Sequence, residues 1–411
     1  MSQPSVSVII VSRGRAEPIA LCLMGVSRLL YDNYEIVVVG DAAALGAVER
    51  AGLKGAVKTV AFDTPNISAA RNLGIAAAAG EIVAFIDDDA VPEPGWLAHL
   101  VRPFGDRAVA SVGGFVRGRN GISYQWRARV VDGAAHHNSI EVDSDAPSVP
   151  VLTAGVALKT EGTNMAFRRD VLANSGGFDT DFAFFLDETD VNYRLAKGGY
   201  KAAISPLAEV HHAYAPSERR KANRAVVDLG VLGRSLAVYL RKHCPEANHE
   251  MRWNAFRAEQ RSRLFDQMKR RLIRSGDVAP LLAGLDAGYA LGQAMNLTPS
   301  RAISVSDSGF LRFSTHATGE VITIAGRFWN ARRLRNLARE RAMAGDTVSL
   351  YLFSRTTLYH QVRYHAPGYW EQKGGIWGRS DRKAAIVQPG SFANRVKREI
   401  KRVIRTRNLA P

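Results

Sequence analysis

The sequence predicts an α/β fold whose first half is a doubly wound, Rossmann-like domain. Apolar, β-branched runs over 6–11, 34–39 and 82–86 predict buried strands, and apolar positions over 17–30 and 66–79 recur at helical spacing. Strands that alternate with helices favour a largely parallel sheet with helices on both faces. Such sheets place ligands beyond the carboxyl ends of their strands, so polar side chains at those ends are the first candidates for a site.

Three adjacent aspartates, Asp87, Asp88 and Asp89, follow the strand predicted over 82–86. Pro92, Pro94 and Gly95 follow within a few residues and predict that the strand does not continue. Adjacent carboxylates repel one another, and a hard divalent cation with oxygen ligands would neutralise them. A solvated acidic loop is the alternative for this stretch alone. Asp41 also lies just past a predicted strand, so one cleft would hold both acidic positions.

Helix signals continue along the chain. Asn66 or Ser68 caps the alanine-rich helix, and the acids from Asp187 to Asp190 open a helix that runs to 195. We interpret 121–157 as a long excursion or a lid. The runs 202–204 and 208–212 predict two short strands, and the second ends at His211 and His212.

Composition limits the class of protein. The chain has 411 residues, a formal net charge of +16 and two cysteines. That length is enough for two or three domains, and two cysteines make a disulfide framework improbable, so we expect a reducing, cytoplasmic location. We expect no signal peptide and no membrane span. The positive charge predicts an anionic partner, which is nucleic acid, anionic lipid or a phosphorylated substrate.

A set of motifs occurs in a fixed order between residues 5 and 215. These are Val-Ser-Arg-Gly-Arg, a strand ending at Asp41, Asn-Ile-Ser-Ala-Ala-Arg-Asn-Leu-Gly-Ile, Phe-Ile-Asp-Asp-Asp, Glu-Gly-Thr-Asn-Met-Ala-Phe-Arg-Arg, Gly-Gly-Phe-Asp, Asp-Glu-Thr-Asp-Val-Asn-Tyr-Arg-Leu and Val-His-His. In this order the chain resembles the inverting family 2 glycosyltransferases of the GT-A fold, which is a doubly wound mixed sheet.

The resemblance implies a nucleotide-diphosphate sugar as donor and a divalent metal, Mn²⁺ or Mg²⁺, as cofactor. The metal ligands implied are Asp87 and Asp89, with His211 or His212 completing the set. The implied donor-binding residues are Ser12, Arg15, Asp41, Arg71, Asp87, Asp88 and Asn164. Asp41 departs from the family pattern by one position, so the resemblance does not name the base.

The paired acids Asp187 and Glu188 match the acids that precede the acceptor helix in this family. By that match Glu188 is the general base that takes the proton of the acceptor hydroxyl, and Asp187 is the alternative. Trp96 is expected either to stack on a sugar or to anchor the core.

The second half lacks the family pattern. We predict a catalytic domain over 1–215, a basic helical region over 216–300 with helices over 222–242 and 252–273, an accessory α/β region over 301–390 and a basic amphipathic tail over 391–411. The aromatic and basic segment 359–382 is either an acceptor surface or a partner contact. The tail is either a helix on an anionic inner membrane leaflet or a disordered segment.

The function predicted is sugar transfer to a hydroxyl of a saccharide or lipid-linked acceptor in polysaccharide, cell-envelope or glycolipid synthesis. The alternatives are an inactive glycosyltransferase-like scaffold and a nucleic-acid-binding protein, for which no recognition motif is present. A sugar-phosphate nucleotidyltransferase would need a glycine-rich nucleotide loop where this chain has Ser12-Arg13-Gly14-Arg15.

Overall fold

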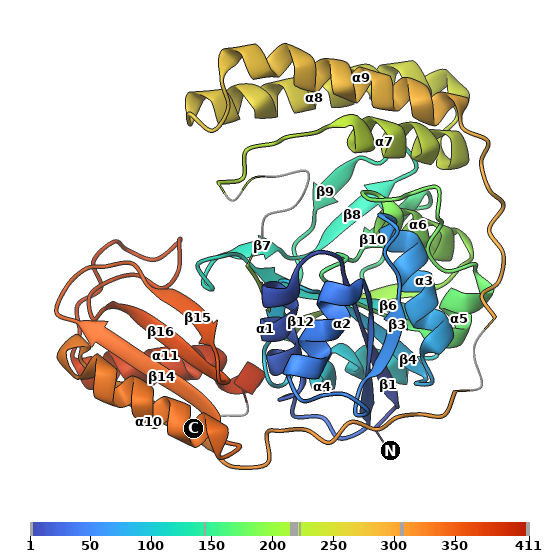
Figure 1. The fold of residues 1–411 in the computed structure, drawn as a ribbon. Coiled ribbons are helices and arrows are strands. Elements are labelled where there is room, and N and C mark those ends of the chain that lie inside the picture. Colours follow the sequence, from blue (N-terminus) through green and yellow to red (C-terminus); the bar gives the residue numbers. More distant parts are fainter. Residues whose placement is uncertain (1–2, 144, 214–220, 222, 305–307, 408–411) are drawn as a thin grey trace.

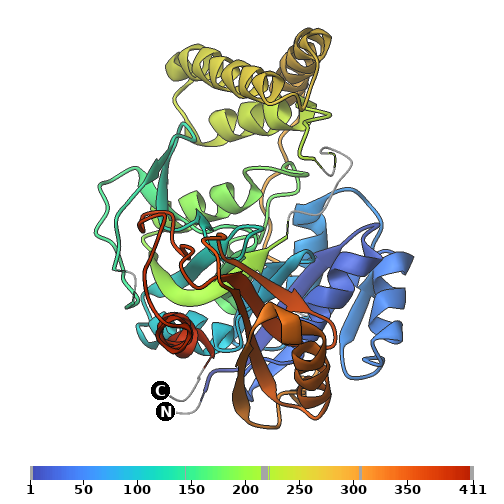
Figure 2. The same cartoon turned by 90° about the vertical axis from the view of Figure 1, so that its left-hand side faces the viewer.

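The structure, a computed structural model, describes residues 3–143, 145–213, 221, 223–304 and 308–407. The central α/β part carries a layer of helices on one side and a smaller α/β domain on another (Figure 1). In the view turned by 90°, the helical layer and the small domain again lie on different sides of the central part (Figure 2).

The core of the first half is a mixed sheet. Among the described residues it has nine strands in the order β3-β2-β1-β4-β11-β6-β12-β5, with β7 paired to β6. The first four strands are parallel, β11 runs antiparallel between β4 and β6, and β5 runs antiparallel to β12. The predicted α/β class is confirmed. The strands are β1 (Val6–Ser12), β2 (Tyr34–Gly40), β3 (Lys58–Ala61), β4 (Ile82–Asp87), β5 (Ala90–Pro92), β6 (Val109–Arg117), β7 (Tyr124–Trp126), β11 (Asn164–Arg168) and β12 (Lys201–His212).

Both faces of this sheet are covered by helices. Side chains alternate along a strand, so Val8 and Ile10 of β1 pack with one set of helices and Ile9 with the other. The first set is α1 (Ala16–Val26), α2 (Ala42–Arg50) and α4 (Trp96–Leu100), followed by the short turn η1 (Arg102–Gly105). The second set is α3 (Ile67–Ala77), α5 (Arg169–Asn174) and α6 (Asp187–Lys197). Helix α1 ends four residues before the predicted end at 30.

Two expectations for the first half are corrected. The stretch 121–157 holds β7, β8 (Arg129–Asp132) and β9 (His137–Ser139), and β8 and β9 form a separate sheet with β10 (Val156–Lys159) in the order β10-β8-β9. The two short strands predicted over 202–204 and 208–212 are one strand, β12, with a shift of register between Ser205 and Glu209. Pro206 lies within this shift. Proline has no N–H to donate to a neighbouring strand, and a bulge is a place in a sheet where such a residue is tolerated.

The helical layer consists of α7 (Gly230–His243), α8 (His249–Lys269) and α9 (Val278–Ala294), with the short turns η2 (Glu246–Asn248) and η3 (Ser275–Asp277) between them. Its apolar cluster includes Leu236, Leu264 and Leu285 and extends to Phe182 and Leu186, so this layer packs onto the central domain. Helices α7 and α9 approach closely because glycines face each other. A Cβ atom on Gly288 would lie 1.9 Å from the carbonyl oxygen of Gly230.

After α9 the chain crosses the outside of the central domain and enters the small domain (Figure 1). Phe313 lies on this path, buried against Tyr34, and its amide donates to the Tyr34 carbonyl at 2.7 Å. The small domain has a sheet in the order β13-β14-β16-β15. Its elements are β13 (Val321–Gly326), η4 (Phe328–Asn330), α10 (Ala331–Met343), β14 (Thr347–Ser354), β15 (Gln361–His365), β16 (Tyr369–Gly375) and α11 (Phe392–Arg407).

One interpretation of the second half is wrong, because Tyr369 and Trp370 are buried in the small domain and the segment 359–382 does not present them as an open acceptor surface. The amphipathic helix predicted in the tail is present over Phe392–Arg407 as α11, which excludes the disordered alternative for these residues. Its apolar side chains Phe392, Val396 and Ile400 pack against the small domain rather than facing outward. No helix among the described residues has the length and hydropathy that a membrane span requires.

The glycine contact between α7 and α9 predicts a position-specific loss of stability. We expect Gly288→Ala to destabilise the protein by about 1–3 kcal/mol, because the added methyl group meets a backbone carbonyl that has no room to move. Urea unfolding followed by circular dichroism at 222 nm measures this change. The matched control is Gly284→Ala in the same helix, where the nearest heavy atom is 4.0 Å away and a gain of up to about 1 kcal/mol is expected. Equal effects at both positions would contradict the explanation.

Candidate active site

The site lies where the parallel strands end. Ser12 closes β1, Asp41 follows β2, and Asp87 closes β4, so the pairing of these strands brings all three to one edge. Asp41 caps α2, since one of its oxygens accepts from the amide of Ala44 at 3.0 Å and the other accepts from the amide of Gly14 at 2.7 Å.

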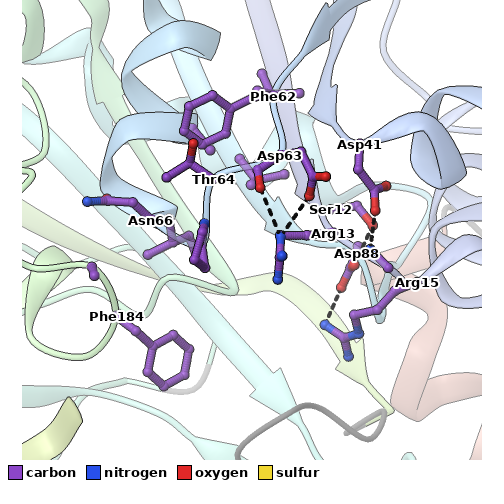
Figure 3. Close-up of a pocket in the computed structure, with 17 residues that line it drawn as sticks. Ser12, Arg13, Arg15, Asp41, Phe62, Asp63, Thr64, Asn66, Asp88 and Phe184 are labelled. Atoms are coloured by element: carbon purple, nitrogen blue, oxygen red, sulfur yellow. Dashed lines mark hydrogen bonds and ion pairs between the residues drawn. The ribbon is translucent and has the colours of Figure 1, made fainter.

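A first cavity of about 660 Å³ opens at this edge (Figure 3). It is lined by the loop after β1, by the residues that follow β3 and by Phe184. Asp63 follows β3 and accepts from Arg13 Nε at 2.9 Å. Aromatic rings and carboxylates around one opening suit a flat, polar ligand such as a nucleoside. The labelled residues are Ser12, Arg13, Arg15, Asp41, Phe62, Asp63, Thr64, Asn66, Asp88 and Phe184.

The floor of the first cavity is an ion-paired cluster. Arg15 donates to Asp88 Oδ1 at 2.6 Å and to Asp89 Oδ2 at 2.8 Å, and Ser12 Oγ donates to Asp88 Oδ2 at 2.7 Å. Burial raises the pKa of Asp88 to about 7, with a smaller contribution from the two flanking aspartates, although Arg15 and Ser12 oppose the shift. The negative charge is therefore only partly compensated by the side chains around it.

Asp87, Asp89 and His212 offer three ligand atoms that all lie within 4.8 Å of one another. His212 Nε2 is 3.1 Å from Asp89 Oδ1. Two carboxylates and an imidazole fit a divalent cation such as Mn²⁺. His212 reaches the cluster because it pairs with Ala90 across β12 and β5, one residue after Asp89.

His211 does not join this cluster, which corrects its predicted place among the metal ligands. Successive side chains of a strand point to opposite faces, so His211 points away from His212. It lies beside Glu93, with 2.8 Å between Nε2 and Oε1.

A second cavity of about 530 Å³ adjoins the first, and both are lined by Arg15, Asp88 and Phe184. Glu188 lines it from the first turn of α6. Lys159 Nζ donates to Glu188 Oε1 at 2.8 Å and to Glu161 Oε2 at 2.9 Å. Burial raises the pKa of Glu188, but Lys159 outweighs burial and lowers that pKa below its ordinary range. Glu188 is therefore an ionised carboxylate at neutral pH.

Asp187 has a different environment. It forms an ion pair with Arg71, whose guanidinium is also 3.8 Å from Asp87 Oδ1. The side chain of Asp187 is 4% exposed, compared with 16% for Glu188. Glu188 is therefore more open to the cavity, while Asp187 fixes a buried arginine next to the aspartate cluster.

The helical layer forms the far wall of the second cavity. Residues of α7 and α8 line it, namely Leu236, Arg252, Phe256, Glu259, Gln260 and Arg263. Arg252 is fixed by the carbonyl of Ala134 at 2.9 Å and by Glu259 at 3.1 Å. The region 216–300 thus contributes to the cavity that holds Glu188.

Asn164 is corrected as a donor-binding residue. It is fully buried, accepts from Trp96 Nε1 at 2.8 Å and donates to the carbonyls of Phe115 and Ala208 at 3.0 and 2.7 Å. These bonds occupy both ends of its amide, and it lines neither cavity. Trp96 is equally buried and serves as a core anchor, not as a sugar platform.

Sequence reasoning missed Lys159, Glu161, Arg129 and Asp63. Arg129 and Lys159 become neighbours only because β8 and β10 pair antiparallel, and Glu161 then accepts from Arg129 Nε at 2.9 Å. Asp63 had a usable signal, since it follows β3 just as Asp41 follows β2.

A mixed α/β sheet with clustered acids and two adjoining cavities at its strand ends defines the class as a ligand-binding α/β domain. Comparison with known proteins then gives a family match: residues 7–173 match the model of glycosyl transferase family 2. This match confirms the resemblance drawn from the motifs.

Curated relatives agree with the family match. The chain is 30% identical over 150 residues to a pre-mycofactocin glycosyltransferase of Mycobacterium tuberculosis, which is 35% of this chain and 29% of that protein. It is 34% identical over 110 residues to the putative glycosyltransferase EpsH of Bacillus subtilis, which is 26% of this chain and 32% of that protein. The chain thus spans about a third or less of the length of these relatives.

Solved structures with a similar arrangement include two glycosyltransferases. GalNAc-T7 with UDP, GalNAc and Mn²⁺ aligns at a TM-score of 0.45 and 16% identity over 58% of this chain and 48% of that chain. The mannosyltransferase PcManGT of Pyrobaculum calidifontis with GDP-Man and Mn²⁺ aligns at a TM-score of 0.44 and 20% identity over 72% of this chain and 88% of that chain.

Proposed function

We propose that the protein is a metal-dependent inverting glycosyltransferase that moves a sugar from a nucleotide-diphosphate sugar to a hydroxyl of a saccharide or lipid-linked acceptor. The observation that carries the proposal is the adjacency of two cavities, one beside the aspartate cluster and one containing Glu188, within a chain whose residues 7–173 match the family. Synthesis of cell-surface polysaccharide or glycolipid is the role that such acceptors suggest.

The first cavity takes the nucleotide in this proposal. Asp41 and Asp63 offer acceptors to base or ribose, and Phe184 offers a ring at the same opening. Arg15 lies between this cavity and the aspartates, where a cationic fork suits a diphosphate. Asp87, Asp89 and His212 would hold Mn²⁺ or Mg²⁺, which when bound supplies positive charge for the departing nucleoside diphosphate.

Glu188 is the general base of the proposal. Its ionised carboxylate is free to accept the proton of an acceptor hydroxyl that enters from the second cavity. Lys159 keeps Glu188 ionised and holds it in place before the acceptor arrives. Asp187 does not share this role, because Arg71 occupies it.

Release of nucleoside diphosphate tests the proposal directly. A panel of UDP-, GDP- and dTDP-sugars is incubated with the full chain and Mn²⁺, Mg²⁺ or EDTA. We expect slow hydrolysis of one donor, abolished by EDTA and by Asp89→Ala and lowered about 100-fold or more by Glu188→Gln, because proton transfer contributes about 10²–10⁴-fold. Glu49→Gln, on the exposed side of α2, is the matched control and should keep the full rate.

Each of the other outcomes of the panel has a definite meaning. In one outcome, calorimetry detects donor binding while neither the wild-type protein nor any variant releases nucleoside diphosphate. If this holds also with acceptor extracts present, the result favours an inactive scaffold. If the protein binds none of the donors, with or without metal, the glycosyltransferase proposal is rejected.

The pH profile tests the pairing of Lys159 with Glu188. Because Lys159 lowers the pKa of Glu188, Lys159→Met should raise that pKa and move the acid limb of the rate profile for donor hydrolysis to higher pH. Activity is then lost at a pH where the wild-type protein still works. The control is Lys54→Met, an exposed lysine in the loop between α2 and β3 that pairs with Glu49. If the acid limb of Lys159→Met stays at the wild-type pH, the ionisation of Glu188 does not control the rate.

We also infer association with an anionic membrane surface at the inner face of the cell membrane. The apolar face of α11 is used within the protein, so attraction depends on exposed basic side chains, which include Lys397, Arg398 and Lys401 of α11 and Arg332 and Arg333 of α10.

Vesicle sedimentation tests this inference. Binding to phosphatidylglycerol vesicles should exceed binding to phosphatidylcholine vesicles and fall as salt rises. The double change Lys397→Glu and Lys401→Glu should weaken binding about tenfold or more, since each basic residue near the surface contributes about 1 kcal/mol. Lys54→Glu is the control. Equal binding to both lipids would contradict the inference.

A further inference from the structure

The carboxylates and the imidazole of the proposed metal site lie on a two-stranded ribbon at the edge of the sheet. Strand β5 begins one residue after Asp89 and runs antiparallel to the end of β12, with Ala90 opposite His212. The amide of Ala213 donates to the carbonyl of Asp89 at 2.8 Å. The relative position of Asp89 and His212 therefore depends on how this ribbon is held. β5 is the last strand in the order of the sheet, so it has a neighbouring strand on one side only.

The face of the ribbon opposite the metal site carries a buried polar network. His211 points to this face and lies 2.8 Å from Glu93 Oε1. Glu93, directly after β5, receives both arms of a guanidinium: Arg407 Nε donates to Oε2 at 2.6 Å and Nη2 donates to Oε1 at 2.8 Å. The side chains of Arg407 and Glu93 are 2% and 1% exposed.

Arg407 belongs to the small domain, since it stands in the last turn of α11. It also donates to Ser349 Oγ of β14 at 3.1 Å, and its guanidinium lies 4.6 Å from the centre of the Trp370 ring. The same Trp370 ring lies 4.5 Å from the His211 ring. Arg407 thus connects two strands of the small domain directly to Glu93 at the end of β5. Through Glu93 and Trp370 the same contacts extend to His211 of β12.

Further contacts hold the ribbon at the same place. The amide of Gly95 donates to the carbonyl of Thr406 at 2.8 Å, next to Arg407. On β12, Glu209 accepts from Arg117 Nε at 2.6 Å and Nη2 at 2.7 Å. The acids of this network are thereby paired with guanidinium groups.

The group formed by Glu93, Glu209 and His211 is compact enough to hold a cation by geometry alone. Its two carboxylates already face Arg407 and Arg117, so a divalent cation there would have to displace two buried guanidinium groups. We therefore interpret this group as a structural connection between domains and not as a second metal site.

We propose that the small C-terminal domain clamps the ribbon from behind the metal site, and that Arg407 is the positioning residue that sets the place of Asp89 and His212. The metal part of this inference rests on the proposed function, whereas the mechanical part concerns only residues of the chain. Bidentate geometry matters here, because two parallel bonds fix the orientation of Glu93 as well as its distance.

Hydrogen exchange of the metal-free full chain tests the clamp without any activity. We expect Arg407→Met to increase the exchange rate of amides in 88–95 and 208–213 about tenfold or more. The matched control is Arg335→Met. Arg335 forms a bidentate pair with Glu371, at 2.7 and 2.8 Å, but it connects α10 to β16 within the small domain. That variant should leave the ribbon at the wild-type rate.

Mn²⁺ affinity, measured by electron paramagnetic resonance of the free ion, is the second readout. Arg407→Met should weaken it about tenfold, and Arg335→Met should not. If Arg407→Met fails to fold, Glu93→Gln tests the same contact, because it keeps the volume of the side chain and one acceptor oxygen.

The outcomes are separable. Wild-type exchange of the ribbon in both Arg407→Met and Glu93→Gln overturns the clamp, as does equal loosening by Arg335→Met. If the ribbon loosens as expected but the wild-type chain binds no Mn²⁺, the clamp stands and the metal dependence of the proposed function fails.

Discussion

Charge crowding at the end of β4 is the constraint on which the rest of the site depends. Three consecutive aspartates leave a buried strand, and burial next to one another is unfavourable for carboxylates. Arg15 approaches from the loop after β1, Arg71 from α3, and His212 from the end of β12. These three segments each bring a basic side chain to the aspartates, and Ser12 adds a hydroxyl that donates to Asp88.

The negative charge of the aspartates is only partly compensated by side chains, which leaves the cluster able to bind a cation. Arg15 touches two of the aspartates and borders both cavities, so a phosphate-bearing ligand would meet a guanidinium that is already oriented. Lys159 plays the corresponding part for Glu188, since it holds the carboxylate ionised while leaving part of it exposed. In both cases an ion pair fixes a charged side chain before any substrate binds, which is the arrangement expected of a preorganised site.

The parts of the site that the sequence predicts are those that depend on local chain direction. The positions of Asp41 and of the aspartates at the end of β4 are predictable because each lies where an apolar strand stops. The cap of α3 is predictable because it needs only the Asn66 side chain and the amide of Ala69. The sequence does not predict that Lys159 and Arg129 belong to the site, because only the pairing of β8 with β10 brings them together. The sequence does not show which of His211 and His212 faces the aspartates. That depends on which face of β12 each side chain occupies. Asn164 matched a motif, yet its partners Trp96, Phe115 and Ala208 come from three distant segments.

The second half of the chain completes the site from two directions. The family match covers residues 7–173, whereas Glu188, His212 and the α8 wall of the second cavity all lie beyond it. Helices α7 and α8 close the side from which an acceptor would come, and α11 reaches the back of the ribbon that carries His212. The aspartate cluster therefore lies within the family match except for His212, while the wall of the second cavity comes partly from the helical layer outside that match. Differences in acceptor choice among related chains should accordingly be sought in the helical layer and not in the aspartate cluster.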